Sequence, residues 1–290
     1  MRSTAQPAPA TSRSRRAAKR LSYAIDDVRS LAVSKSHAST SVAQDVVLAY
    51  HRVGGLTPSP VDLSTSMFGR QMAHLRASEH VITLDQLVAA HQAKQSTTVS
   101  STVLTFDDGT ADFVDIALPI LVRYSLPATL YLATEFVDSG RLYPANGHPV
   151  SWNALRDAMS TGLVTIGAHT HTHRLLDRCT ESEAAYELQM SASRIEDELG
   201  VAARHFAYPK AVAPRGGSAE ALVRSWYESA AIAGTRPNSR DATDLWRLRR
   251  SPIQNADGWE GFRRKVTGGM RSEDDLRRVI NLVRYRGVTS

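Results

Sequence analysis

The sequence predicts an α/β fold in which a mainly parallel sheet is covered by helices. Two observations carry this prediction. Short apolar runs without polar alternation, typical of strands buried on both faces, alternate along the chain with segments of helical period. The length of 290 residues is normal for a single α/β barrel, so we expect one large domain rather than two.

The expected strands are the apolar runs that recur at intervals long enough to hold a helix between them. The first, VVLAY at residues 46–50, is rich in β-branched and aromatic side chains. Six further short apolar runs give the expected strands 102–106, 128–133, 164–168, 205–208, 231–234 and 248–253. Six or seven βα units follow from this count, which is the arrangement of a parallel sheet covered by helices.

Helical periodicity and capping residues mark the segments between these strands. Phe68, Met72 and Leu75 are spaced i, i+4 and i+7 and therefore share one helix face. Thr180 forms a capping box with the residue three positions on, and Gly200 can end that helix in the left-handed conformation. The other expected helices cover residues 85–92, 113–124, 151–160, 219–229, 259–267 and 272–285, and residues 136–150, which hold two Gly and two Pro, are expected to form a loop.

Residues 1–44 differ from the rest of the chain in composition and charge. They hold eight basic and two acidic side chains, which accounts for the whole net charge of +6. They lack apolar periodicity, so we expect them to form a disordered basic tail. The remaining residues 45–290 carry no net charge, which argues against a nucleic-acid-binding protein. The basic charge of the tail is the sole feature in favour of that class.

The distribution of apolar residues and cysteine excludes further classes. No run approaches the ~18 apolar residues of a membrane span, which excludes an integral membrane protein. The basic cluster of the tail is not followed by the apolar run of a secretory signal, so we expect a cytoplasmic protein; the alternative is export by a route that the sequence does not reveal. The single cysteine, Cys179, excludes an intrachain disulfide and a Cys-rich zinc module.

Polar clusters follow three of the expected strands at their carboxyl ends, where parallel α/β folds place their sites. After the strand 102–106, Asp107 and Asp108 precede Gly109. This sequence is compatible with a simple turn. The functional interpretation is that one carboxylate binds a metal while its neighbour acts as a base, because adjacent side chains diverge in direction.

Three histidines lie within five residues after the strand 164–168. His169 and His173 are four residues apart, so a compact loop or one helical turn directs both imidazoles at one ion. Two histidines and one carboxylate form a set that binds Zn²⁺ or a similar divalent metal and leaves positions open for water and substrate. His171, between them, is either a further ligand or a bystander.

The third cluster, HFAYPK at residues 205–210, by itself indicates only the end of a strand. In order along the chain, however, TFDDG, then H-T-x-T-H, then F-A-Y-P resemble the polysaccharide deacetylases with the NodB homology domain, carbohydrate esterase family 4. The upstream YHRV at residues 50–53 is similar to the Y-H-x-V strand of many members, particularly of the F-A-Y-P-Y-G subgroup.

This resemblance implies a distorted (β/α)₇ barrel of the NodB type over residues 45–290, and removal of N- or O-acetyl groups from a saccharide. Asp108, His169 and His173 would be the ligands of a divalent metal, Zn²⁺ first and Ni²⁺ or Co²⁺ as alternatives. Asp107 would be the general base that takes a proton from a metal-activated water.

The sequence departs from the better-known members at the general acid and in the third motif. No histidine follows His205, where those members carry Leu-x-His, so His51 is the candidate acid; alternatively, it organises its loop. Lys210 and Ala211 stand in place of Tyr-Gly, and the backbone amide of Lys210 would stabilise the oxyanion. The expected substrate-binding residues are Tyr208, Pro209, Lys210 and Arg249. Arg249 would either orient a site carboxylate or lie at the surface.

Two other functions are compatible with these residues. The same site on a related fold would hydrolyse a formyl group or a cyclic amide on a smaller molecule. The altered third motif and the missing C-terminal histidine agree with a carbohydrate-binding protein whose site has decayed. The intact Asp107, Asp108, His169 and His173 oppose that alternative.

Overall fold

The computed structural model describes residues 23, 43–95, 97–214, 216–270 and 272–274. Most of the expected basic tail, and the expected helix 272–285 beyond its first three residues, lie outside this range. Within the described part of the chain, no helix combines the length and the apolar character needed to cross a membrane.

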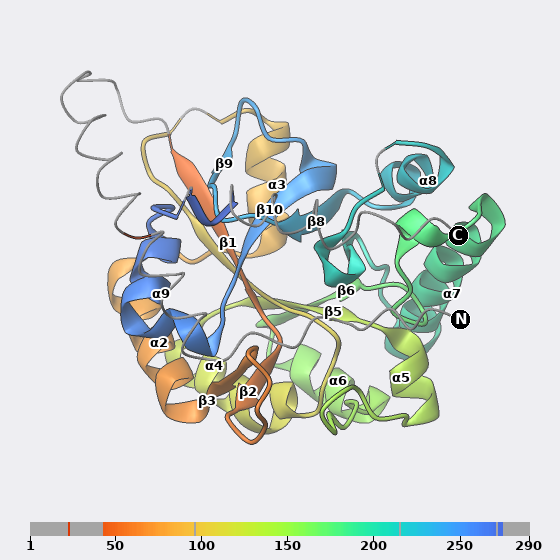
Figure 1. The fold of residues 1–290 in the computed structure, drawn as a ribbon, viewed down its shortest axis with the longest axis horizontal. Coiled ribbons are helices and arrows are strands. Elements are labelled where there is room, and N and C mark those ends of the chain that lie inside the picture. Colours follow the sequence, from red (N-terminus) through yellow and green to blue (C-terminus); the bar gives the residue numbers. More distant parts are fainter. Residues whose placement is uncertain (1–22, 24–42, 96, 215, 271, 275–290) are drawn as a thin grey trace, which may run out of the picture.

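Seven parallel strands close into a barrel at the centre of the molecule (Figure 1). They are β1 (Gln44–Tyr50), β4 (Thr102–Phe106), β5 (Ala128–Leu132), β6 (Val164–Ala168), β7 (His205–Ala207), β8 (Ser229–Ala233) and β10 (Leu248–Pro252). Each strand pairs in parallel with the next, and β10 pairs with β1, which closes the ring. The expected (β/α)₇ barrel is therefore confirmed.

Three short strands that the sequence did not indicate complete the sheets. The antiparallel β9 (Asn238–Ser239) pairs with the start of β1. Directly after β1, β2 (Arg52–Gly54) pairs in parallel with β3 (Asp62–Ser64). These strands are two or three residues long, too short to show a period of their own.

Helices connect the strands and surround most of the barrel (Figure 1). They are α2 (Thr65–Ser78), α3 (Leu84–Gln92), α4 (Leu118–Tyr124), α5 (Thr134–Ser139), α6 (Trp152–Ser160), α7 (Glu181–Leu199), α8 (Ser218–Trp226) and α9 (Gly258–Val266). Single 3₁₀ turns lie at Leu176–Arg178, Pro209–Ala211, Leu245–Arg247 and Asn255–Asp257, and the π-helical turn η1 (Phe113–Ala117) precedes α4.

Two segments differ from the sequence-based expectation. The expected loop 136–150 begins inside α5, which starts at Thr134 and ends at Gly140 in the left-handed conformation. The expected helix 113–124 begins as the π-helical turn η1, in which the N–H of Leu118 donates to the carbonyl of Phe113. Pro119, the next residue, has no N–H to donate, which weakens regular α-helical bonding at this point.

The long helix α7 begins and ends where its caps predict. The Thr180 hydroxyl accepts the N–H of Glu183, the Glu183 carboxylate accepts the N–H of Thr180, and Gly200 closes the helix at φ 69°. Buried apolar residues such as Leu188 pack into the core around the barrel. The same face carries Glu187, a buried charged residue that contacts the loop after β6.

Strand residues alternate between the barrel interior and the layer under the helices. Val47 belongs to the interior cluster, whereas its neighbour Leu48 belongs to the larger outer core. The interior cluster consists of Val47, Val103, Tyr131, Ala207, Ala231 and Leu248 from the strands, with Leu84, Leu87 and Val88 of α3. Because α3 contributes to it, this helix closes the barrel at the amino ends of the strands. The pocket described below lies at the opposite end.

Candidate active site

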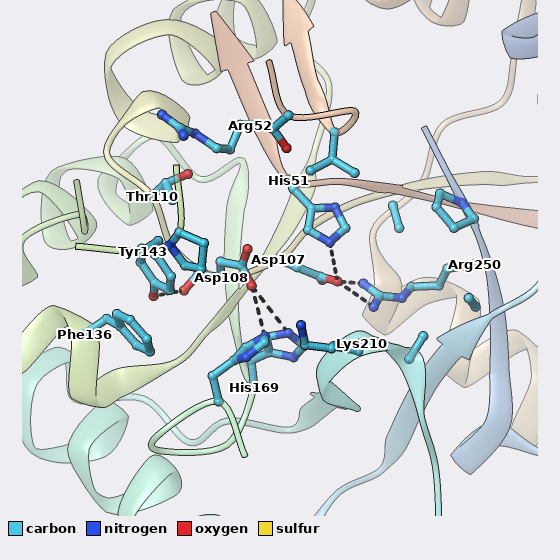
Figure 2. Close-up of a pocket in the computed structure, with 18 of the residues that line it drawn as sticks. His51, Arg52, Asp107, Asp108, Thr110, Phe136, Tyr143, His169, Lys210 and Arg250 are labelled. Carbon is cyan, nitrogen blue, oxygen red and sulfur yellow. Dashed lines mark hydrogen bonds and ion pairs between the residues drawn. The ribbon is translucent and has the colours of Figure 1, made fainter. Parts of the chain in front are cut away.

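Residues from five barrel strands converge on one pocket at the carboxyl end of the barrel (Figure 2). They are His51 after β1, Asp107 and Asp108 after β4, His169 and His173 after β6, Lys210 after β7, and Arg250 within β10. The pocket has a volume of about 440 Å³. Neighbouring parallel strands end at the same edge, which explains how residues as far apart in the sequence as His51 and Arg250 come together.

Three of these side chains form a cluster with the composition of a metal site. Ligand atoms of Asp108, His169 and His173 all lie within 4.8 Å of one another. Asp108 Oδ1 is 3.4 Å from His173 Nε2 and 3.7 Å from His169 Nε2. His171 does not take part, because its Nδ1 pairs with the hydroxyl of Thr134 at 2.8 Å.

Burial and hydrogen bonding give His169 the protonation state that a metal ligand needs. Its Nδ1 lies 2.7 Å from the carbonyl of Ala207, so this nitrogen carries the proton and donates it. The Nε2 lone pair is thereby directed toward Asp108. Burial lowers the pKa of His169 to about 4, which keeps the ring neutral. A neutral imidazole held by a backbone carbonyl is the usual support of a metal-ligating histidine.

Asp108 is held in its ionised form. Burial by itself would raise its pKa, but the hydrogen bond from His173 opposes this effect, and the pKa lies well below its usual range. One carboxylate and two imidazoles are a donor set suited to Zn²⁺ or a similar divalent ion. These residues therefore fit the metal that the sequence motifs imply.

Left-handed backbone fixes the directions of these side chains. Asp108, Thr170 and His173 have φ values of 75°, 61° and 62°. Non-glycine residues in this region cost about 1–3 kcal/mol each and persist only where their surroundings enforce them. Gly109 follows at φ 95°, and a Cβ there would lie 2.7 Å from the side chain of Leu132. The site is thus held in a preset arrangement by the packing around it.

A buried carboxylate clamps the loop that carries the histidines. Glu187 of α7 accepts the N–H of Thr172 at 2.8 Å and the hydroxyl of Thr172 at 2.6 Å. In the loop after β4, the carbonyl of Asp108 accepts a hydrogen bond from the Tyr143 hydroxyl at 2.5 Å. The two loops that hold the cluster are therefore each fixed from outside it.

Asp107 forms a two-point ion pair with Arg250 inside the barrel. Arg250 Nη1 lies 2.6 Å from Asp107 Oδ1, and Nη2 lies 2.8 Å from Oδ2. The same Nη1 lies 3.1 Å from the hydroxyl of Thr105, and the guanidinium lies over the ring of Tyr131. Burial alone would raise the pKa of Asp107, but the charge of Arg250 and its hydrogen bonds to the carboxylate lower it. Asp107 is therefore ionised at neutral pH.

From the sequence, Arg249 was either the residue that orients a site carboxylate or a surface residue, and the structure gives the carboxylate contact to Arg250 instead. The Arg249 guanidinium donates to the carbonyl of Pro237, and its stem packs against Gly234. The two arginines are neighbours on β10, and neighbouring strand residues point to opposite faces. Of these two arginines, Arg250 lines the pocket and Arg249 does not.

His51 lies beside Asp107, at the edge of the pocket. Its Nε2 is 3.8 Å from Asp107 Oδ2, and 27 % of its side chain is exposed. The imidazole therefore reaches both the buried carboxylate and the open part of the pocket (Figure 2).

The third motif contributes its later residues to the pocket. Lys210 and Ala211 line it, whereas the side chains of Tyr208 and Pro209 are buried and do not. Phe136, Arg141 and Tyr143 line another part of the same pocket. They come from α5 and from the remainder of the segment expected to be a loop.

The closed (β/α)₇ barrel places an Asp-His-His cluster, which can hold a divalent ion, beside an ionised carboxylate that can accept a proton. The family model for polysaccharide deacetylase matches residues 94–221, which include both aspartates, both histidines and Lys210. This segment of the chain is therefore similar to the polysaccharide deacetylase family. Among curated proteins, none matches the sequence significantly.

Solved structures share this fold. The Streptococcus pyogenes deacetylase PplD in complex with acetate superposes with a TM-score of 0.68 at 19% identity, covering 78% of this chain and 99% of its own. IcaB from Ammonifex degensii gives 0.65 at 19% identity, with 79% and 97% covered. A de-N-acetylase from Aggregatibacter actinomycetemcomitans gives 0.63 at 20% identity, with 77% and 99% covered. At this level of identity, the likeness concerns the fold.

Proposed function

We propose that the protein is a metal-dependent deacetylase that hydrolyses the N-acetyl, or O-acetyl, group of a saccharide. The single observation that carries this proposal is the Asp108, His169 and His173 cluster beside the ionised Asp107. The match of residues 94–221 to the polysaccharide deacetylase model supports deacetylation, and the names of similar structures include a deacetylase and a de-N-acetylase.

Asp108, His169 and His173 would hold the ion. When bound, a divalent metal ion would lower the pKa of a ligated water and polarise the acyl carbonyl. Asp107 is the general base in this proposal, because it lies next to the cluster without belonging to it and is ionised at neutral pH. Arg250 keeps its carboxylate in one orientation, with both oxygens engaged.

His51 is the general acid in this proposal. Cleavage of the C–N bond requires a proton on the leaving nitrogen. Among the described residues that line the pocket, His51 is the histidine outside the metal cluster that stands next to Asp107. Its partial exposure lets it exchange protons with solvent between turnovers. The backbone amide of Lys210, at the pocket wall, would stabilise the developing oxyanion.

The test combines metal content with acetate release from N-acetylglucosamine oligomers, using protein purified without chelators. We expect about one ion per chain. Asp107→Asn should keep the ion and lose acetate release, whereas His169→Ala should lose both. Asp115→Asn, a change at an exposed aspartate in η1, is the matched control and should retain both.

Two results would redirect or overturn the proposal. An ion bound without acetate release from any oligomer would move the assignment to a formyl, cyclic amide or other acyl substrate. A folded protein that binds no Zn²⁺, Ni²⁺ or Co²⁺ would contradict a metal-dependent enzyme and favour the carbohydrate-binding alternative.

For His51, the critical comparison is His51→Ala with and without added imidazole. General acid catalysis is worth about 10²–10⁴-fold, so kcat should fall by that factor and recover in part with imidazole. An unchanged chemical rate would return His51 to the role of organising its loop.

A further inference from the structure

Cationic side chains line the pocket on two sides of the reacting centre. Figure 2 shows Arg52 and Lys210 on opposite sides of Asp107 and Asp108, and Arg141 also lines the pocket. A saccharide without charge offers no counter-charge to any of these groups. Their pairing within the protein therefore determines which of them is available to a substrate.

The arginines have partners in the fold. Arg250 is engaged by Asp107 through both nitrogens of its fork. Arg52 donates to the carbonyl of Ala145 and lies 3.6 Å from a carboxylate oxygen of Asp112. Each of these guanidiniums is thus held by the protein itself.

Arg141 is paired as well. It binds Glu135 through two nitrogens and lies over the ring of Phe136. Lys210 differs from all three arginines, because its ammonium forms no ion pair or hydrogen bond with the rest of the described chain. It lines the pocket and is exposed.

The backbone that carries Lys210 is fixed while its ammonium is not engaged. The N–H of Tyr208 donates to the carbonyl of Ala231, and the N–H of Ala211 donates to the carbonyl of Tyr208. Lys210 and Ala211 both have left-handed backbone, at φ 52° and 59°. Two such residues in succession persist only where the surroundings enforce them. The lysine therefore projects from a rigid base at the pocket wall, on the side that holds His169.

We propose that Lys210 binds an anionic group of the substrate, so that the preferred substrate is an acylated amino sugar that carries a phosphate or a carboxylate. This inference rests on the proposed deacetylase function and adds the substrate class. A lysine ammonium is a compact point charge suited to phosphate or carboxylate oxygens. The cavity of about 440 Å³ lies within the range of small-ligand sites, about 300–1,000 Å³.

The test compares three matched disaccharides with the metal-loaded protein. One is the neutral N-acetylglucosamine disaccharide, one carries a phosphate, and one carries a uronic acid carboxylate. Acetate release gives kcat/KM for each. The quantity of interest is the ratio of the anionic to the neutral substrate, measured at low and at high salt.

We expect at least one anionic substrate to exceed the neutral one, and the ratio to fall as salt screens the charge. Lys210→Met should lower that ratio about fivefold, the upper range for an exposed ion pair, and Lys210→Arg should retain most of it. The control is Lys94→Met, since Lys94 is exposed, also has left-handed backbone at φ 46°, and does not line the pocket. Direct contact of phosphate with the metal would give the same ratio in Lys210→Met as in wild type, so the comparison of these two proteins separates it from binding by Lys210.

The outcomes distinguish this inference from the function beneath it. If the neutral and anionic substrates react equally in wild type, or if Lys210→Met leaves the ratio unchanged, Lys210 does not select an anionic group, while the deacetylase stands. If none of the three releases acetate although the metal is bound, the deacetylase assignment itself fails. A preference confined to the phosphate or to the carboxylate identifies which anion the site takes.

Discussion

Removing the Glu187 carboxylate should loosen the histidine loop and weaken metal binding without touching a ligand. Glu187 accepts two hydrogen bonds from Thr172, which lies between His171 and His173. Hydrogen bonds to a charged group are worth about 1.5–3 kcal/mol each, so Glu187→Ala removes several kcal/mol of support from the loop.

Part of that support is replaced by other contacts of the same loop. The carbonyl of His171 accepts the N–H of Glu135 at 2.9 Å, and its ring pairs with Thr134. The loop should therefore remain folded but occupy a wider range of positions at His173. We expect the Kd for Zn²⁺ to rise about 10–100-fold, the usual effect of losing a group that orients a ligand.

Competition calorimetry with Zn²⁺ measures this change, and hydrogen exchange at the Thr172 amide measures the loop without any metal. Glu187→Gln is the matched control. Its amide oxygen can accept the Thr172 N–H while its nitrogen donates to the hydroxyl, so most of the affinity should remain. Wild-type Kd and wild-type exchange protection in Glu187→Ala would refute the idea that this carboxylate positions the loop.

Three further predictions concern the stability of the barrel. Hydrogen bonds from His91 and Arg240 lower the pKa of Asp45 to about 2 despite its burial. The ionised carboxylate therefore stabilises the fold by about 2 kcal/mol above pH 3.8, and this contribution is lost as the pH falls toward 2. The stabilities of Asp45→Asn and wild type, measured by urea titration, should converge over that window, and a constant difference would contradict this. Gly167→Ala should cost about 1–3 kcal/mol in the same assay, because its Cβ would lie 2.5 Å from the Tyr131 ring; an unchanged midpoint would mean that the ring can shift freely. Thr180→Ala should lower thermal stability by about 1 kcal/mol through loss of the α7 cap, and an unaltered Tm would show that the cap contributes nothing.

The barrel and the metal cluster could be predicted because their signals are local. Unalternated apolar runs reported the seven strands, and Asp108, His169 and His173 lie in short motifs at strand ends. The capping box at Thr180 was visible for the same reason. The short strands β2, β3 and β9 were not, since two or three residues show no period, and β9 in addition pairs with a strand far along the chain.

The arginine that holds Asp107 was one residue from the predicted position for a physical reason. Both faces of a barrel strand are buried, so the apolar pattern of β10 does not show which of Arg249 and Arg250 points inward. One signal was available: Leu248 lies in the interior cluster, and the residue two positions on shares its face. Assigning Leu248 to the interior, however, requires the closed barrel.

Closure of the barrel by β10 and β1 has a consequence for the matched segment 94–221. That segment contains β4, β5, β6 and β7 but lacks β1, β8 and β10. Cut out alone, it would present unpaired backbone along β4 and β7 and an uncovered apolar sheet, which are the properties of an aggregating fragment. It would also lack His51 and Arg250. The segment recognised by its motifs is therefore smaller than the unit that can fold, and folding needs both ends of the ring.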